Sequence, residues 1–320
     1  MIAQNNETIF FKWIMNKISR VLVAVDLTEI DETLVQYMVL LSNNISIDKV
    51  YFFNVMKDLI LPDHIIEKYP DLVAPMDEST KKEIQYTIDE VAGNQLKTEY
   101  EIIVTDGNSA GKILKWSKIK EVDLIVLGKK SGLEGEGIVS GKVVRLATCS
   151  VVMVPEVLPS NLKNIVVPID YSATSKLAFE FALYMASNIP DIGLTCLNIF
   201  EVPTGYHLSG KSFNEFAEIM KQNAEESFNE FINQYDTEGI KIKAKYELDD
   251  KGNIAKKIYQ FAVKEKASAI VIGSKGRTQV AAILLGSIAE KLVKLNAQLP
   301  LVVVKQRRHN MDFLEALLKI

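Results

Sequence analysis

The sequence predicts an α/β fold made of two tandem doubly wound domains, each with a five-stranded parallel sheet. With 320 residues, the chain is long enough for about two domains. Short β-branched runs alternate with longer amphipathic stretches, and continuously apolar strands separated by helices are typical of a parallel sheet covered on both faces. Similar segments also recur 144 or 145 residues apart, which indicates an internal repeat.

The repeat fixes the predicted domain boundaries. Each copy opens with a polar residue, an apolar run and an aspartate, and later carries a Gly-Asn pair before a helical pattern and an apolar run that ends in glycine. Two prolines in residues 155–161 indicate a linker. We therefore expect domains at residues 19–155 and 162–305, followed by an amphipathic tail at 306–320. The matching segments are 20–26 and 164–170, 107–108 and 252–253, and 123–128 and 268–273.

The individual elements follow from the apolar periodicity. In the first copy we expect strands at residues 21–25, 50–54, 100–104, 124–127 and 151–154, with a helix at 77–96. In the second copy we expect strands at 165–169, 194–200, 240–248, 269–272 and 301–304, with helices at 172–187, 213–234 and 254–265.

The composition argues against several classes of protein. A net charge of −4 gives no general attraction to nucleic acid or anionic lipid. Two cysteines in different halves and three scattered histidines argue against a disulfide framework or a metal site. The apolar run at 9–15 is interrupted by Lys12 and is too short to span a membrane. We expect it to be a packed leader, with a partner or membrane-surface contact as the alternative, and we expect a cytoplasmic protein.

A glycine motif follows the fourth strand of the second copy. The sequence reads Gly273-x2-Gly276-x9-Gly286-Ser287, and the last two residues open a helical pattern. Glycines let main-chain amides approach a phosphate closely, and a helix N-terminus favours an anion. The pattern predicts a phosphate cradle, in which Lys275 and Arg277 are candidate neighbours. A simple helix cap after a flexible loop is the alternative.

An aspartate ends the first strand at the same predicted sheet edge. In doubly wound sheets, ligands bind beyond the carboxyl ends of the strands where the strand order reverses. A carboxylate at Asp170 could accept hydrogen bonds from an adenine amino group or a ribose hydroxyl, although it could also cap the helix that begins near Ser172. The chain has no Walker A sequence and no HExxH, and no catalytic residue is expected.

With these motifs the chain resembles the universal stress protein family, and its second copy resembles the ATP-binding branch. The resemblance covers both halves and implies a Rossmann-like fold of the adenine nucleotide alpha hydrolase kind. It also implies ATP as the ligand, with AMP or ADP as alternatives, and Mg²⁺ or Mn²⁺ on the phosphates. The residues implied are Pro168, Asp170 and Ile199 for adenine and ribose, Ile272 and Gly273 beside the ribose, and Gly276, Gly286, Ser287 and Ile288 at the phosphates.

The first copy departs from this pattern. Asp26 and Gly128 are present, but Ser131 stands where the second glycine is expected. The closing element aligns either at Gly141-Lys142 or, with a better helix match, at Gly137-Ile138. The second alignment leaves 9 positions from Gly128 to the closing glycine, against 13 from Gly273 to Gly286. Both alignments remove the hydroxyl, so the first domain is expected to have a degenerate nucleotide loop and a structural role.

The resulting expectation is a cytoplasmic ATP-binding regulator that acts through nucleotide-dependent conformation in the stress response. A slow ATPase or nucleotide hydrolase and a nucleotide-free protein-interaction module are the alternatives. The resemblance further implies pairing of the fifth strands, here as an intramolecular pseudo-dimer, with a homodimer or an unknown protein partner beyond it. The tail at 306–320 is expected to dock on its own chain or a sister subunit, with a separate partner as the alternative.

Overall fold

The computed structural model describes residues 18–56, 68, 76–130, 138–160, 162–276, 285–296 and 298–306. The predicted leader, the tail from residue 307, and residues 131–137 and 277–284 lie outside the described residues. The chain divides into two compact units, Lys17–Leu158 and a unit that contains Pro159–Ile320. We call them the N-terminal and the C-terminal domain. No helix in the described ranges is long and apolar enough to cross a membrane.

The N-terminal domain contains a five-stranded parallel sheet in the order β3-β2-β1-β4-β5. The order reverses between β1 and β4, because the chain moves outward in one direction through β2 and β3 and then returns to the other side of β1. The elements are β1 (Arg20–Val25), α2 (Ile30–Asn44), β2 (Lys49–Met56), α4 (Met76–Ala92), η2 (Gly93–Gln95), β3 (Tyr100–Asp106), α5 (Ser109–Ile119), β4 (Leu124–Lys129), α6 (Ile138–Leu146) and β5 (Ser150–Pro155).

The C-terminal domain repeats this topology, with the parallel strand order β8-β7-β6-β9-β10. Its reversal lies between β6 and β9. The predicted doubly wound fold of two tandem domains is thus confirmed. The elements are β6 (Asn164–Pro168), α7 (Ala173–Asn188), β7 (Gly193–Phe200), η3 (Tyr206–Ser209), α8 (Phe213–Ile232), β8 (Ile242–Leu248), α9 (Ile254–Lys264), β9 (Ala269–Gly273), α10 (Ser287–Leu295) and β10 (Leu301–Val304).

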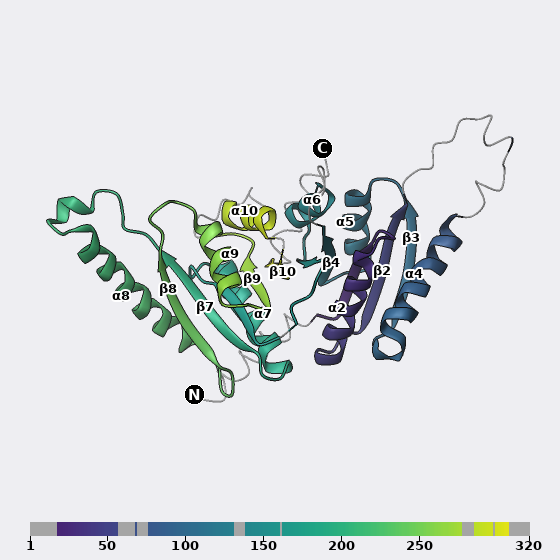
Figure 1. Cartoon of the computed structure of the whole chain (residues 1–320), viewed down its shortest axis with the longest axis horizontal. Coiled ribbons are helices and arrows are strands. Elements are labelled where there is room, and N and C mark those ends of the chain that lie inside the picture. The colour runs from purple at the N-terminus through teal and green to yellow at the C-terminus, as the bar shows by residue number, and fades with distance from the viewer. Residues whose placement is uncertain are drawn as a thin grey trace. The chain divides into compact units, whose positions relative to one another are not determined.

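Helices flank the sheet in each domain (Figure 1). In the N-terminal domain α2 packs against α4, and α5 packs against α6. In the C-terminal domain α7 crosses β6, β9 and β10, α8 lies against β7 and β8, and α9 packs against α10. The central strands β1, β4, β6 and β9 are almost entirely buried, as expected for strands covered on both sides.

The repeat extends to individual backbone conformations. The residue after the first aspartate is left-handed in both copies, with φ of 59° at Leu27 and 63° at Tyr171. Glu121 and Lys266, 145 residues apart, both have φ of 51°. The Gly-Asn pairs also correspond, because Asn108 and Asn253 each cap the following helix with the side-chain oxygen. The two domains therefore share turn geometry as well as topology.

Two predicted boundaries differ from the structure for a local reason. The helix expected at 77–96 ends as an α-helix at Ala92, because Gly93 has φ of 47°, which a right-handed helix cannot continue. A 3₁₀ turn follows it. The strand expected from residue 240 begins at Ile242, since Gly239 is left-handed and the Ile240 N–H bonds back to the Thr237 carbonyl.

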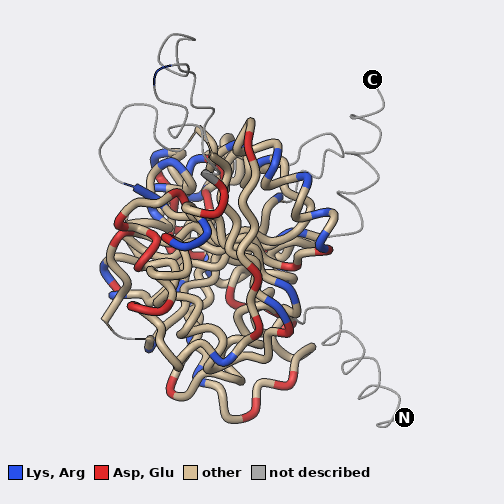
Figure 2. The backbone as a smooth tube through the Cα atoms, turned by 90° about the vertical axis from the view of Figure 1, so that its right-hand side faces the viewer, with Lys and Arg blue, Asp and Glu red and all other residues tan. Residues whose placement is uncertain are grey.

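Charges are mixed along the chain. Lys and Arg are interspersed with Asp and Glu along the described backbone (Figure 2). This distribution matches a folded domain with a solvated surface.

Candidate functional site

The candidate site lies at the carboxyl ends of β6 and β9, where the strand order of the C-terminal domain reverses. Pro168 is the last residue of β6, and Asp170 follows two residues later. Ile272 and Gly273 are the last two residues of β9. Parallel strands end at one edge of the sheet, so these four predicted residues share that edge.

The two later glycines of the motif come together beside Asp170. A Cβ on Gly276 would lie 3.2 Å from Asp170 Oδ2, and one on Gly286 would lie 3.6 Å from the Gly276 nitrogen. The Gly286 N–H also donates to the Ser274 carbonyl at 2.7 Å. Residues 274–276 and Gly286 therefore lie close together at the sheet edge. A larger residue at either glycine would fill this space.

The first glycine of the motif, Gly273, has a packing role. A Cβ on Gly273 would lie 2.5 Å from the carbonyl carbon of Thr174, far inside normal contact. Glycine at this position lets the first turn of α7 pack directly against the end of β9. The Thr174 hydroxyl then donates to the Lys275 carbonyl and accepts from the Lys275 N–H at 3.2 Å. The start of α7 thus holds the residue that precedes Gly276.

Asp170 lies in a backbone bend that is strained at the next residue, Tyr171, and is held by several contacts. Its Oδ1 accepts the Ser172 N–H at 3.0 Å, which forms a local turn before α7. Tyr171 between them has a left-handed backbone, and its hydroxyl donates to the Ala224 carbonyl of α8 at 3.1 Å. Its ring contacts Phe231 edge-on, with the ring centroids 5.8 Å apart. These contacts from α8 fix the direction in which Asp170 leaves the sheet.

The remaining predicted residues lie around this centre. Ile199, half-buried, is the penultimate residue of β7, the strand next to β6. The neighbouring Asn198 donates from its side chain to the Ile169 carbonyl at 2.8 Å, which ties the two strand ends together. Ser287 is exposed at the first position of α10, with Gly286 as the N-cap and Ile288 next in the first turn.

The corresponding edge of the N-terminal domain is occupied by its own side chains. Lys130, the counterpart of Lys275, forms an ion pair with Asp26, with Nζ 2.6 Å from Oδ2. The buried Asp31 carboxylate accepts the N–H groups of Asp26 and Leu27, the latter at 2.8 Å. Burial raises the pKa of Asp31 from 3.8 to about 6, against the opposing effect of these hydrogen bonds. Asp26 here therefore faces a lysine of its own chain.

The structure also decides how the two glycine motifs align. Helix α6 ends at Leu146, and helix α10 ends 149 residues later, at Leu295. This agrees with the alignment that places Gly137-Ile138 opposite Gly286-Ser287. Ile138 has no hydroxyl, so the serine at the start of α10 has no equivalent in the N-terminal domain.

Sequence reasoning missed two residues that shape these edges, Thr174 and Asp31, and it missed the pairing of Lys130 with Asp26. A residue-by-residue comparison of the copies would have pointed to Thr174 and Asp31, but not to Lys130, whose counterpart Lys275 is also a lysine. Thr174 corresponds to Ile30, and Asp31 to Ser175, at the 144-residue offset, and each pair exchanges a polar for an apolar side chain or a charged for a neutral one.

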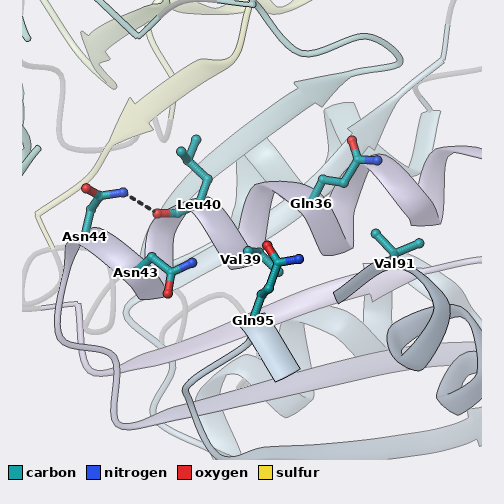
Figure 3. Close-up of a pocket in the computed structure, with 7 residues that line it drawn as sticks. All are labelled: Gln36, Val39, Leu40, Asn43, Asn44, Val91 and Gln95. Carbon is teal, nitrogen blue, oxygen red and sulfur yellow. Dashed lines mark hydrogen bonds between the residues drawn. The ribbon is translucent and has the colours of Figure 1, made fainter. Parts of the chain in front are cut away.

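A pocket of about 370 Å³ lies elsewhere, between α2 and the α4–η2 segment of the N-terminal domain (Figure 3). Because α2 runs back from the carboxyl edge, its last residues lie near the amino ends of the strands. Amide side chains and aliphatic groups line this pocket, without a charged group, so it does not match a polyphosphate. The lining residues are Gln36, Val39, Leu40, Asn43, Asn44, Val91 and Gln95.

Comparison with known proteins places both halves in one family. Residues 17–155 and 161–305 each match the universal stress protein family. Universal stress protein MJ0531 of Methanocaldococcus jannaschii is 33% identical over 145 residues, which cover 45% of this chain and 82% of that protein. Universal stress protein MJ0577 of the same organism is 27% identical over 159 residues, which cover 45% of this chain and 96% of that protein.

Solved structures agree on the fold. A universal stress protein from Archaeoglobus fulgidus superposes with a TM-score of 0.61 at 18% identity, over 91% of this chain and 97% of that one. The functionally unknown protein PA1789 from Pseudomonas aeruginosa gives 0.63 at 16% identity, over 96% and 99%. The chain therefore belongs to the universal stress protein family and contains two copies of the family domain in tandem.

Proposed function

We propose that the C-terminal domain binds ATP at the edge formed by β6, β9 and α10, and that the chain acts as a cytoplasmic, nucleotide-dependent regulator. Family membership supports a role in the stress response. The observation that carries the nucleotide proposal is the convergence of Asp170, Gly276 and Gly286 at one point of the sheet edge. A carboxylate for the adenosine part and glycine amides for the phosphates would then lie in one site.

The phosphates would be held by main-chain N–H groups. Glycine at 276 and 286 leaves room for an anion to approach the backbone, and the first turn of α10 adds amide donors and a favourable dipole. The Ser287 hydroxyl, exposed at the start of that helix, would add a donor. A divalent cation, Mg²⁺ or Mn²⁺, would accompany the phosphates. AMP and ADP would use the same site with fewer phosphate contacts.

The N-terminal domain would not bind nucleotide. Its aspartate is paired with Lys130, and its closing helix begins with Ile138 in place of serine. To bind adenosine there, a ligand would have to displace the lysine from Asp26. We propose that this domain serves as a structural partner for the C-terminal one.

Isothermal titration of the full chain with ATP tests the site. Gly276→Val places two methyl groups beside Asp170 and should weaken ATP binding at least about 30-fold, because the side chain fills the space between that carboxylate and the glycine amides. Gly141→Val is the matched control, since a Cβ at that glycine of the N-terminal domain meets nothing within 4 Å. Equal ATP affinity of wild type and Gly276→Val, or no binding by wild type, would refute the proposed site.

A further inference from the structure

Thr174 occupies a special place beside the candidate site. It is buried, with 5% of its surface exposed, in the first turn of α7. Its hydroxyl makes two hydrogen bonds to the same residue, donating to the Lys275 carbonyl and accepting from the Lys275 N–H at 3.2 Å. The Ser172 hydroxyl lies 3.5 Å from the same carbonyl. The start of α7 therefore holds the Lys275 backbone through hydrogen bonds from one side.

These hydrogen bonds determine the direction of the next amide, the Gly276 N–H. In a planar trans peptide the carbonyl oxygen and the following N–H point in opposite directions. With the Lys275 carbonyl directed at Thr174, the Gly276 N–H is directed away from α7. Gly286 lies close to that nitrogen, with its Cβ position 3.6 Å away. The nitrogen of this amide therefore lies close to Gly286, the N-cap of α10.

We propose that Thr174 is a positioning residue that presents the Gly276 N–H to the phosphates of the bound nucleotide. The proposal rests on the function proposed above and names a residue outside the glycine motif on which that site depends. Preorganised donors are effective because they need no rearrangement when the anion arrives. Without the threonine hydroxyl, the peptide between Lys275 and Gly276 could rotate and the donor would be lost.

The N-terminal domain supplies an internal comparison. Ile30 occupies the position of Thr174, and a Cβ on Gly128 would lie 2.7 Å from its Cδ1, so the same close approach of helix and strand is kept. The isoleucine has no hydroxyl to hold the carbonyl of Lys130. The close packing of helix on strand is thus shared by the two domains, whereas the hydrogen bonds to the backbone depend on the threonine. This contrast separates a structural role of the position from a positioning role.

The test compares ATP and AMP affinities of full-length variants by isothermal titration. Thr174→Val keeps the shape but removes both hydrogen bonds, and should weaken ATP binding about tenfold while changing AMP binding less than about threefold. Thr174→Ser keeps the hydroxyl and should retain the wild-type ratio of the two affinities. If the valine variant does not fold, Thr174→Ala removes the same hydrogen bonds without adding a methyl group to the packed turn.

Thr195→Val is the matched control. Thr195 is equally buried in the same domain, but its hydroxyl bonds to Asn164 Oδ1 at 2.8 Å at the opposite edge of the sheet. It should leave the ratio of ATP to AMP affinity unchanged even if it lowers stability. Two outcomes would overturn the role of Thr174 alone, provided that wild type binds ATP. One is an unchanged ratio of ATP to AMP affinity in Thr174→Val or Thr174→Ala. The other is a loss of ATP affinity in Thr174→Ser equal to that in Thr174→Val. Failure of wild type to bind ATP would instead reject the proposed function.

Discussion

Adding one methyl group at equivalent glycines of the two domains should have unequal effects. In Gly273→Ala the new Cβ would lie 2.5 Å from the Thr174 carbonyl carbon and 2.6 Å from its oxygen. Ordinary contact begins near 3.4 Å, so the first turn of α7 would have to retreat by about 0.9 Å. Backbone cannot rotate away as a side chain can. We expect a destabilisation of about 3 kcal/mol, at the upper end of the usual overpacking cost.

Gly128→Ala provides the comparison in the N-terminal domain. There the new Cβ would meet the end of the Ile30 side chain at 2.7 Å. Rotation of that side chain can relieve the clash, so we expect a cost of about 1 kcal/mol. The loss of unfolded-state freedom on changing glycine to alanine is the same in both variants and cancels in the difference. Gly273→Ala should therefore be worse by about 2 kcal/mol.

Hydrogen exchange monitored by mass spectrometry at increasing urea measures both effects in the full chain. Peptides from α7 and β9 report the C-terminal domain, and peptides from α2 and β4 report the N-terminal one. The free energy of opening should fall mainly in the domain that carries the substitution. Equal losses in the two variants, or a larger loss in Gly128→Ala, would show that the close approach at Gly273 does not limit packing at this edge.

Three further outcomes are expected. Because burial raises the pKa of Asp31 from 3.8 to about 6, the folded state binds more protons between these values, and the contribution of Asp31 to wild-type stability should fall by about 2 kcal/mol as the pH rises from 4 to 7. Urea titrations of Asp31→Asn should lack this step, and parallel curves would contradict the assignment. Phe231→Ala should cost about 4 kcal/mol in urea unfolding, because Phe231 is buried and meets Phe179 and Tyr235 at centroid distances of 5.0 and 5.1 Å; a loss below about 1 kcal/mol would contradict it. Ser212→Ala removes a capping box and should speed amide exchange in the first turn of α8 about fivefold, whereas unchanged exchange would show that the cap is not used.

The sequence was informative where local chemistry decides the structure. Apolar runs located the strands, and the Gly-Asn pairs marked helix starts that Asn108 and Asn253 indeed cap. The proximity of Asp170 to Gly276 also followed, because both come after strands that end at one edge of a parallel sheet. These inferences needed only periodicity, turn chemistry and topology.

Other features depend on contacts between distant segments. The hydroxyl of Thr174 reaches Lys275, 101 residues away, and Lys130 reaches Asp26 across 104 residues. No local pattern distinguishes these side chains from ordinary residues at a helix start or on a loop. The raised pKa of Asp31 arises from its burial among the strand ends, which periodicity alone did not indicate. These contacts depend on which strands are neighbours in the sheet and on where the following helix begins, and a local sequence pattern specifies neither.

The left-handed bends at Leu27 and Tyr171 bear on what the fold itself requires. A side-chain-bearing residue in this conformation costs roughly 1 kcal/mol, yet both halves retain the bend with φ of 59° and 63°. One half pairs its aspartate with a lysine of its own, whereas the other keeps the glycine loop. A costly feature that both halves keep is therefore one that the shared fold requires at the end of its first strand. The surroundings of the aspartate differ between the halves, so the fold does not fix them in the same way.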